Sequence, residues 1–190
     1  CNTCSAHPQE CNGSMEDYYS TEREFKKHHV TEVNKSVLEV LDTVMDPEIP
    51  VLSILDLGIV REVRVQDGKV DIAITPTYTG CPAMHLIEME IRAAMAQSGL
   101  EANVKTVLSP AWTTDWMREG ALEKLSQYGI APPGRIASMQ HADTATPKRI
   151  ECPQCTSSNT EVISEFGSTA CKALYRCLDC REPFDYFKCH

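Results

Sequence analysis

Thr75-Pro-Thr-Tyr-Thr-Gly-Cys-Pro-Ala-Met84 joins two kinds of hydrophobic periodicity. Before it, apolar and polar side chains alternate from Val70 to Ile74, which is the pattern of a half-buried strand. After it, apolar side chains recur three or four positions apart, which predicts an amphipathic helix from Pro82 to about Ser98. Proline suits the first turn of a helix, because the N–H group that it lacks would have no partner there. The stretch therefore predicts a strand that turns directly into a helix, with Cys81 at the junction.

Cys81 has two interpretations at this junction. It would face the unpaired N–H groups and the positive dipole end of the predicted helix. Both features favour a thiolate over a thiol, which makes the sulfur a candidate soft-metal ligand or nucleophile. The alternative is a small buried side chain that only closes the turn. Taken by itself, the position favours this second interpretation.

The rest of the chain predicts an α/β unit around this junction. The expected elements are a helix over residues 31–45, a strand over 59–66, a strand over 69–75, a third strand over 104–108 and a helix over 115–128. Asp67-Gly68 is a strong two-residue hairpin signal between the first two strands. The element order predicts an α/β fold, a small mixed sheet with one antiparallel hairpin and helices packed on it.

Composition excludes several classes of protein. The formal charge is −9, and residues 148–190 contain six Lys or Arg and six Asp or Glu, so the front of the chain carries all the excess acid. That sign is wrong for a surface that follows nucleic-acid phosphates. We find no apolar run near the ~18 to 20 residues that a membrane span needs, and no signal peptide. Six of the ten cysteines lie after residue 150 in metal-like spacing, which suits a reducing cytoplasm better than a disulfide framework.

We expect four segments along the chain. Residues 1–30 are interpreted as a disordered leader, in which Cys1, Cys4, His7 and Cys11 could alternatively form a metal clip. Residues 31–130 form the α/β domain, and 131–149 form a linker rich in Pro, Ala, Ser and Thr. Residues 150–190 form a zinc ribbon.

Two CxxC pairs define the ribbon. Cys152-Pro-Gln-Cys155 and Cys177-Leu-Asp-Cys180 each place two thiolates on one tight turn, and two such turns complete a tetrahedral zinc site. About 40 residues make too small a core to fold by packing alone, so the metal would supply much of the folding free energy. Cys171 and Cys189 exceed the four ligands. Either they are weakly buried thiols, or they belong to an alternative ligand set that could hold an iron–sulfur cluster.

Two groups of motifs resemble known families. Asp46-Pro-Glu-Ile-Pro50 and Thr77-Tyr-Thr-Gly-Cys-Pro82 resemble SufT-like iron–sulfur assembly domains, which have a DPE-type turn and a later T-x-x-x-C-P. With Pro110–Trp116 and the tail Glu165–Cys189, about residues 33–190 closely resemble the family of D subunits of bacterial phenylacetyl-CoA epoxidase systems. The resemblance implies the α/β layer with an appended ribbon, and a place in phenylacetate catabolism.

The same resemblance implies a maturation role beside a multicomponent monooxygenase. Its partners would be the di-iron oxygenase subunit and the flavin and 2Fe–2S reductase subunit, and a second copy of the chain could form a homodimer. Cys81 would bind iron or an iron–sulfur cluster transiently. Asp46 and Glu48 would position it, ligate weakly or contact the client. No catalytic residue is assigned, since the sequence has no Walker motif, no GxGxxG and no di-iron ligand pattern.

Three alternatives remain at this level. The ribbon could bind nucleic acid, although the neutral ribbon and acidic body disfavour this. A CxxC pair could exchange disulfides, which metal-bound thiolates would prevent. The chain could also be a docking scaffold, with large aromatic side chains as anchors rather than core: Trp112, Trp116, Tyr186 and Phe187.

Overall fold

The structure, a computed structural model, describes residues 32–66, 68–133 and 150–188. The expected leader, the hairpin residue Asp67, nearly all of the expected linker and Cys189 lie outside these ranges. None of the helices in these ranges has the length and apolar character needed to span a bilayer.

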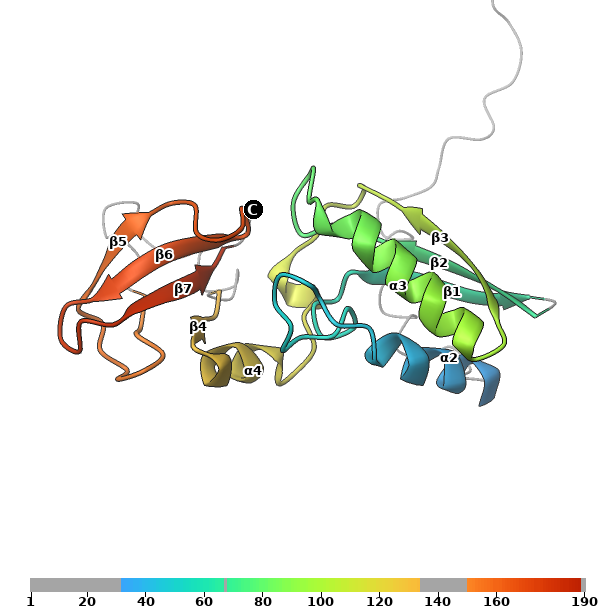
Figure 1. Ribbon diagram of the computed structural model, residues 1–190, viewed down its shortest axis with the longest axis horizontal. Coiled ribbons are helices and arrows are strands. Elements are labelled where there is room, and N and C mark those ends of the chain that lie inside the picture. Colours follow the sequence, from blue (N-terminus) through green and yellow to red (C-terminus); the bar gives the residue numbers. More distant parts are fainter. Residues whose placement is uncertain (1–31, 67, 134–149, 189–190) are drawn as a thin grey trace, which may run out of the picture. The chain divides into compact units, whose positions relative to one another are not determined.

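A three-stranded mixed sheet forms the first layer. β1 (Val60–Gln66) pairs antiparallel with β2 (Lys69–Ile74), and β2 pairs parallel with β3 (Glu101–Thr106). α3 (Ala83–Gln97) is the crossover between the two parallel strands, and it lies along the sheet in Figure 1. Parallel neighbours need such a crossover, whereas the hairpin needs only two residues. The expected small mixed sheet with helices is confirmed.

The core explains why these segments adopt these elements. The alternating residues of β2, Val70, Ile72 and Ile74, are all buried. Ile87 and Ile91 of α3 recur at helical spacing and join the same apolar cluster. α2 (Glu32–Asp42) buries Val37 and Leu41 in this cluster as well. The two periodicities thus converge on one layer between helices and sheet.

Two predicted helices differ from the observed ones. α2 ends at Asp42, three residues before the predicted end, and Met45 instead forms an isolated bridge with Ser53. The single helix expected over residues 115–128 is split into a 3-10 turn, η1 (Thr114–Trp116), and α4 (Ala121–Tyr128). Gly120 separates them in the left-handed conformation, which an α-helix interior excludes.

A second, four-stranded sheet contains the ribbon. Its order is β4 (Ile130–Ala131), β7 (Pro183–Phe187), β6 (Lys172–Cys177) and β5 (Thr160–Ser164). The last three are antiparallel (Figure 1), whereas β4 pairs parallel with β7. The linker was expected from residue 131, where the structure has β4. Two residues are too few to show a periodicity, so the sequence predicts no such strand.

The ribbon shares a core with the α/β domain. Phe187 and Cys171 are buried in the same apolar cluster as Trp112. The Trp112 and Phe187 rings meet edge to face with centroids 6.0 Å apart, and the Trp112 indole N–H donates to the carbonyl of Leu57 over 2.9 Å. Of the proposed docking anchors, Trp112 and Phe187 are therefore core residues, and Tyr186 is buried in the second apolar cluster, within the ribbon. The guanidinium of Arg61 lies over the ring of Trp116, 3.2 Å from its centroid.

Candidate functional site

The Asp46–Pro50 turn is held by the side chain of its first residue. Asp46 Oδ1 accepts hydrogen bonds from the backbone N–H groups of Glu48 and Ile49, each over 2.8 Å. Pro47 and Pro50 further restrict the backbone conformation of the turn. Burial raises the pKa of Asp46, although the two N–H groups act in the opposite direction. The turn therefore fixes the backbone position of Glu48, the second acidic residue of the candidate site.

The Thr75–Cys81 loop connects β2 to α3. The Thr75 N–H donates to the Ile59 carbonyl over 2.8 Å, which extends the sheet by one hydrogen bond beyond β2. Gly80 adopts a positive φ of 87°, and the N–H of Cys81 donates to the Tyr78 carbonyl over 3.3 Å. Cys81 is half-buried and packs against the main core cluster together with Tyr78. The predicted junction of strand, cysteine and helix is thus present.

The protonation of Cys81 differs from the expectation. Burial raises the pKa of the Cys81 thiol, and the negative charges of Glu48 and Asp46 raise it further. The N–H of Ala83, in the first turn of α3, and the Tyr78 hydroxyl donate to the sulfur and lower the pKa, as a helix end should. These two donors do not outweigh burial and the carboxylates. The raised pKa favours the thiol over the thiolate when no cation is present, which argues against a free nucleophile.

Cys171 reaches the same acidic turn from the ribbon. Its side chain is only 3% exposed, and its Sγ donates to Glu48 Oε2 over 3.3 Å. Thr169 Oγ1 lies 3.0 Å from the same sulfur. Burial raises the pKa of Cys171 to about 12, and the neighbouring Glu48 contributes to the increase. The structure places this cysteine beside Glu48 and not among the four CxxC sulfurs, and Cys189 lies outside the described residues.

Tyr78 links the two cysteines electrostatically. Burial raises the pKa of the Tyr78 phenol to about 12, and the charges of Cys81, Glu48 and Cys171 all contribute. Sequence reasoning did not assign a role to Tyr78, although it lies within the Thr77–Pro82 motif. The site therefore contains two thiols, a carboxylate and a phenol from three separate segments of the chain.

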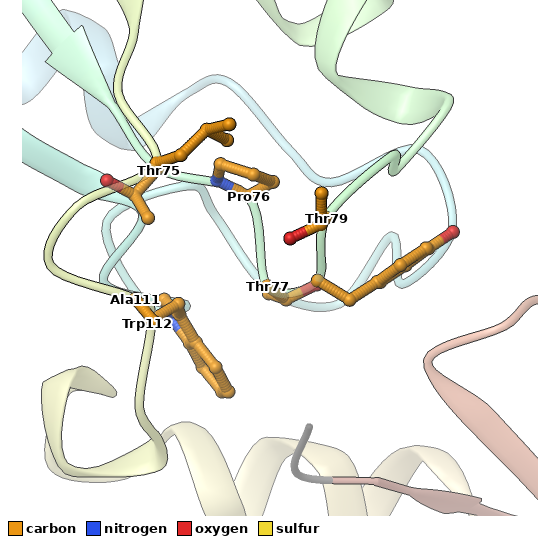
Figure 2. A pocket seen from close by; sticks show the side chains of 8 residues that line it. Thr75, Pro76, Thr77, Thr79, Ala111 and Trp112 are labelled. Carbon is orange, nitrogen blue, oxygen red and sulfur yellow. The ribbon is translucent and has the colours of Figure 1, made fainter.

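A cavity of about 370 Å³ is lined by the same loop. Figure 2 shows Thr75, Pro76, Thr77 and Thr79 on the loop and Ala111 and Trp112 on a second segment, and Tyr78 also lines the cavity. The Thr75 hydroxyl is buried without a hydrogen-bond partner in the described part of the chain. No sequence signal predicted a cavity, but Pro110–Trp116 is one of the segments that carry the family resemblance.

The four CxxC sulfurs form a metal-binding cluster. The Sγ atoms of Cys152, Cys155, Cys177 and Cys180 all lie within 4.8 Å of one another. Cys152 and Cys180 are 3.8 Å apart, and Cys155 and Cys177 are 3.5 Å apart. A tetrahedron with zinc–sulfur bonds of about 2.3 Å has edges of about 3.8 Å, so the donor set fits zinc.

Backbone N–H groups lower the pKa values of Cys155, Cys177 and Cys180, but neighbouring sulfurs and desolvation raise those of Cys155 and Cys180 above the ordinary value. The N–H of Cys180 donates to Cys177 Sγ over 3.5 Å and lowers the pKa of Cys177 to about 7. The N–H of Cys152 donates to the Ser157 carbonyl over 2.9 Å, and that of Cys177 donates to the Glu182 carbonyl over 3.0 Å. These bonds close the two turns that carry the ligands. The cluster is suited to hold an ion, not to react.

Comparison with known proteins matches both parts of the chain. Residues 34–108 match the model of the family "Iron-sulfur cluster assembly protein", and residues 137–188 match the model "PaaD zinc beta ribbon domain". The first match includes Asp46, Glu48 and Cys81, and the second includes Cys171.

Three relatives have names that bear on function. The chain is 52% identical over 151 residues to a protein of Escherichia coli (strain K12) named as the putative D subunit of 1,2-phenylacetyl-CoA epoxidase, and the match covers 79% of this chain and 89% of that protein. It is 35% identical to an "Fe-S protein maturation auxiliary factor" of Porphyromonas gingivalis, over 50% of this chain and 91% of that one. A protein of Bacillus subtilis with the same description is 34% identical, over 45% of this chain and 85% of that one.

Proposed function

Since this chain belongs to the family of D subunits of 1,2-phenylacetyl-CoA epoxidase, we propose that it is an accessory protein of such an epoxidase system in phenylacetate catabolism. It assists assembly of the iron–sulfur or di-iron centre in the reductase or oxygenase subunit and does not itself transform substrate. Its similarity to two Fe–S protein maturation auxiliary factors supports this role. The cytoplasm, where the CxxC thiols stay reduced, is the proposed location.

The observation that carries this proposal is the position of Cys81 beside the Asp46–Glu48 turn. Both carboxylates act on the Cys81 thiol, although they lie more than 30 residues earlier in the chain. A thiolate next to carboxylates is a donor set for iron, and soft thiolate ligands suit iron–sulfur chemistry. Burial favours the Cys81 thiol over the thiolate, so metal binding at Cys81 would release its proton to solvent.

Each residue of this site has a proposed part. Cys81 is the ligand that takes and releases iron or a cluster. Glu48 supplies a carboxylate, and Asp46 positions Glu48 through the two backbone hydrogen bonds of the turn. The Tyr78 hydroxyl donates to the Cys81 sulfur, which orients the sulfur and stabilises the thiolate as the proton leaves.

We assign zinc to the four-cysteine cluster, with a structural role. Its four thiols close a tetrahedron and leave no position for substrate, which is typical of structural zinc. The ion would hold together the turn that precedes β5 and the turn that follows β6, and the ribbon in turn contributes Phe187 to the shared core. The oxygenase and reductase subunits are the proposed partners.

A deletion strain tests the role of Cys81. We expect Cys81→Ala to leave the purified oxygenase and reductase short of iron and the strain deficient in epoxidase activity. Glu90→Gln is the matched control, because it removes an exposed carboxylate from α3 without touching the site. Zinc content of the variants reports on folding. Full iron content of both clients with Cys81→Ala would overturn the assignment.

A further inference from the structure

We propose that Cys171 of the ribbon, Cys81 and Glu48 together form a second metal site, separate from the four-cysteine cluster, which takes a ferrous ion. The inference rests on the proposed function and deepens it, because it names the donor set and the cargo. It also gives the ribbon a part in the chemistry of the site in addition to its structural part.

The contact between Cys171 and Glu48 is the first argument. Both side chains are at least partly withdrawn from water, and the thiol donates to the carboxylate over 3.3 Å. Withdrawing a carboxylate from water costs free energy that a packing role would not recover. A buried cysteine with only a packing role behaves as a small apolar side chain and needs no acidic partner. The pair is therefore better explained by a ligand that both groups bind.

Backbone and side-chain contacts fix both groups in place. The N–H of Lys188 donates to the carbonyl of Cys171 over 2.8 Å, and Thr169 contacts its sulfur. On the other side, Lys172 Nζ donates to the carbonyl of Glu48 over 3.4 Å and pairs with Asp185 over 3.3 Å. Lys172 is buried, so this contact is shielded from solvent. Such supporting contacts are what a preorganised ligand pair requires.

Cys81 shares this surrounding with Cys171. Cys81 and Tyr78 pack against the core cluster that contains Cys171. Glu48 and Asp46 lie close enough to both sulfurs to act on them electrostatically. Two sulfurs beside carboxylates form a donor set that a divalent cation would bind, because the cation neutralises the thiolates and Glu48 together.

Glu48, Cys81 and Cys171 do not form a closed set of ligands, which suits transfer of the ferrous ion better than its storage. In the described part of the chain, only the four CxxC sulfurs form a closed group within 4.8 Å. Glu48, Cys81 and Cys171 therefore have to draw together around the ion, which weakens binding. Binding one ferrous ion releases two thiol protons to solvent and forms two iron–sulfur bonds and one iron–oxygen bond. Transfer to a client reverses this step without any change of oxidation state.

Cobalt(II) is the probe for this site, as a spectroscopic substitute for ferrous iron. The full chain, with its ribbon loaded with zinc, is titrated with cobalt(II) without oxygen. We expect one further ion per chain and a thiolate-to-cobalt charge-transfer band, with zinc retained. Cys81→Ser and Cys171→Ser should each lose about half of the band and bind roughly tenfold or more weakly. Glu48→Gln should weaken binding but keep the band, and the exposed ribbon variant Glu161→Gln should change neither.

Three results would overturn the inference. These are the absence of a second cobalt ion, an unchanged band in Cys171→Ser, and zinc release that accounts for the cobalt bound. If Cys171→Ser loses zinc, and so its fold, X-ray absorption at the cobalt edge of the unaltered chain decides. Two sulfur ligands per cobalt ion are expected, and one or none would refute the site.

The complementation test separates this inference from the proposed function. A second ion that binds as expected, with Cys171→Ser still restoring full iron to the clients, would support the site and refute delivery through it. No second ion, with Cys81→Ala failing in the deletion strain, would refute the site and leave the maturation role supported.

Discussion

The thiol of Cys171 donates a hydrogen bond to the carboxylate of Glu48 over 3.3 Å, although 123 residues separate the two in the chain. One residue belongs to the ribbon, and the other to the acidic turn of the α/β domain. The contact lies beside the shared core formed by Trp112 and Phe187. The ribbon is therefore part of the candidate site. Loss of its metal or a change in its packing should alter the surroundings of Cys81.

Removal of the ribbon metal should loosen the shared core. A strong chelator is expected to unfold the ribbon, because its small core depends on the metal. Phe187 would then leave Trp112, and tryptophan fluorescence should change together with the loss of zinc. Readdition of zinc should reverse the change. Fluorescence that stays constant while zinc is lost would show that the ribbon core folds without its metal.

Truncation of Phe187 should be strongly destabilising. Phe187→Ala removes a fully buried ring from the core, for which we expect a loss of about 3 to 5 kcal/mol in the free energy of unfolding. Phe166→Ala is the matched control in the same ribbon. Its ring is 64% exposed, so the expected change is within about 0.5 kcal/mol. Denaturant unfolding of both variants measures the difference, and equal losses would contradict the shared core.

Gly58 permits a close approach of two backbone segments. Its φ is +69°, and an added Cβ would lie 2.0 Å from the carbonyl oxygen of Trp116. Gly58→Ala should therefore cost roughly 2 to 4 kcal/mol, from strain and the clash together. Gly68→Ala is the control, because Gly68 also has a positive φ but nothing lies within 4 Å of an added Cβ. It should cost only about 1 to 2 kcal/mol. Thermal unfolding that ranks the two variants the other way would refute the packing argument.

The Asp56–Lys124 ion pair should make stability depend on acid pH. Burial alone would raise the pKa of Asp56, but the Lys124 ammonium at 2.6 Å and hydrogen bonds from Ser53 outweigh it and lower the pKa. A carboxyl whose pKa is lower in the folded state stabilises above its unfolded pKa of about 4. That contribution is lost as the pH falls through the folded value.

Lys124→Met tests this relationship, because it leaves the buried Asp56 without its cation. At neutral pH we expect a loss of about 1 to 3 kcal/mol. Below about pH 4 the variant should lose less further stability than the unaltered chain does. The free energy of unfolding, measured from about pH 3 to 7, checks both effects. Parallel pH profiles would assign the acid sensitivity to other carboxyl groups.

Much of the fold could be predicted because its signals are local. The alternation in Val70–Ile74 and the helical spacing after Pro82 each lie within one element, and the structure contains both. The two CxxC pairs are equally local, since two sulfurs three residues apart lie on one turn whatever surrounds them. By contrast, the prediction of one helix over residues 115–128 was wrong. Gly120 adopts a left-handed conformation that interrupts the helix, and this conformation leaves no mark on the spacing of apolar residues.

The sequence by itself determined the strand–helix junction at Cys81, the acidic turn and the four metal-binding sulfurs, because spacing along the chain sets all three. Only the tertiary structure decided that the pKa of Cys81 is raised and that Cys171 lies against Glu48 instead of among the CxxC sulfurs. Protonation depends on burial and on charges from distant segments, and a contact across 123 residues depends on how two sheets share one core. Neither quantity is encoded in local spacing.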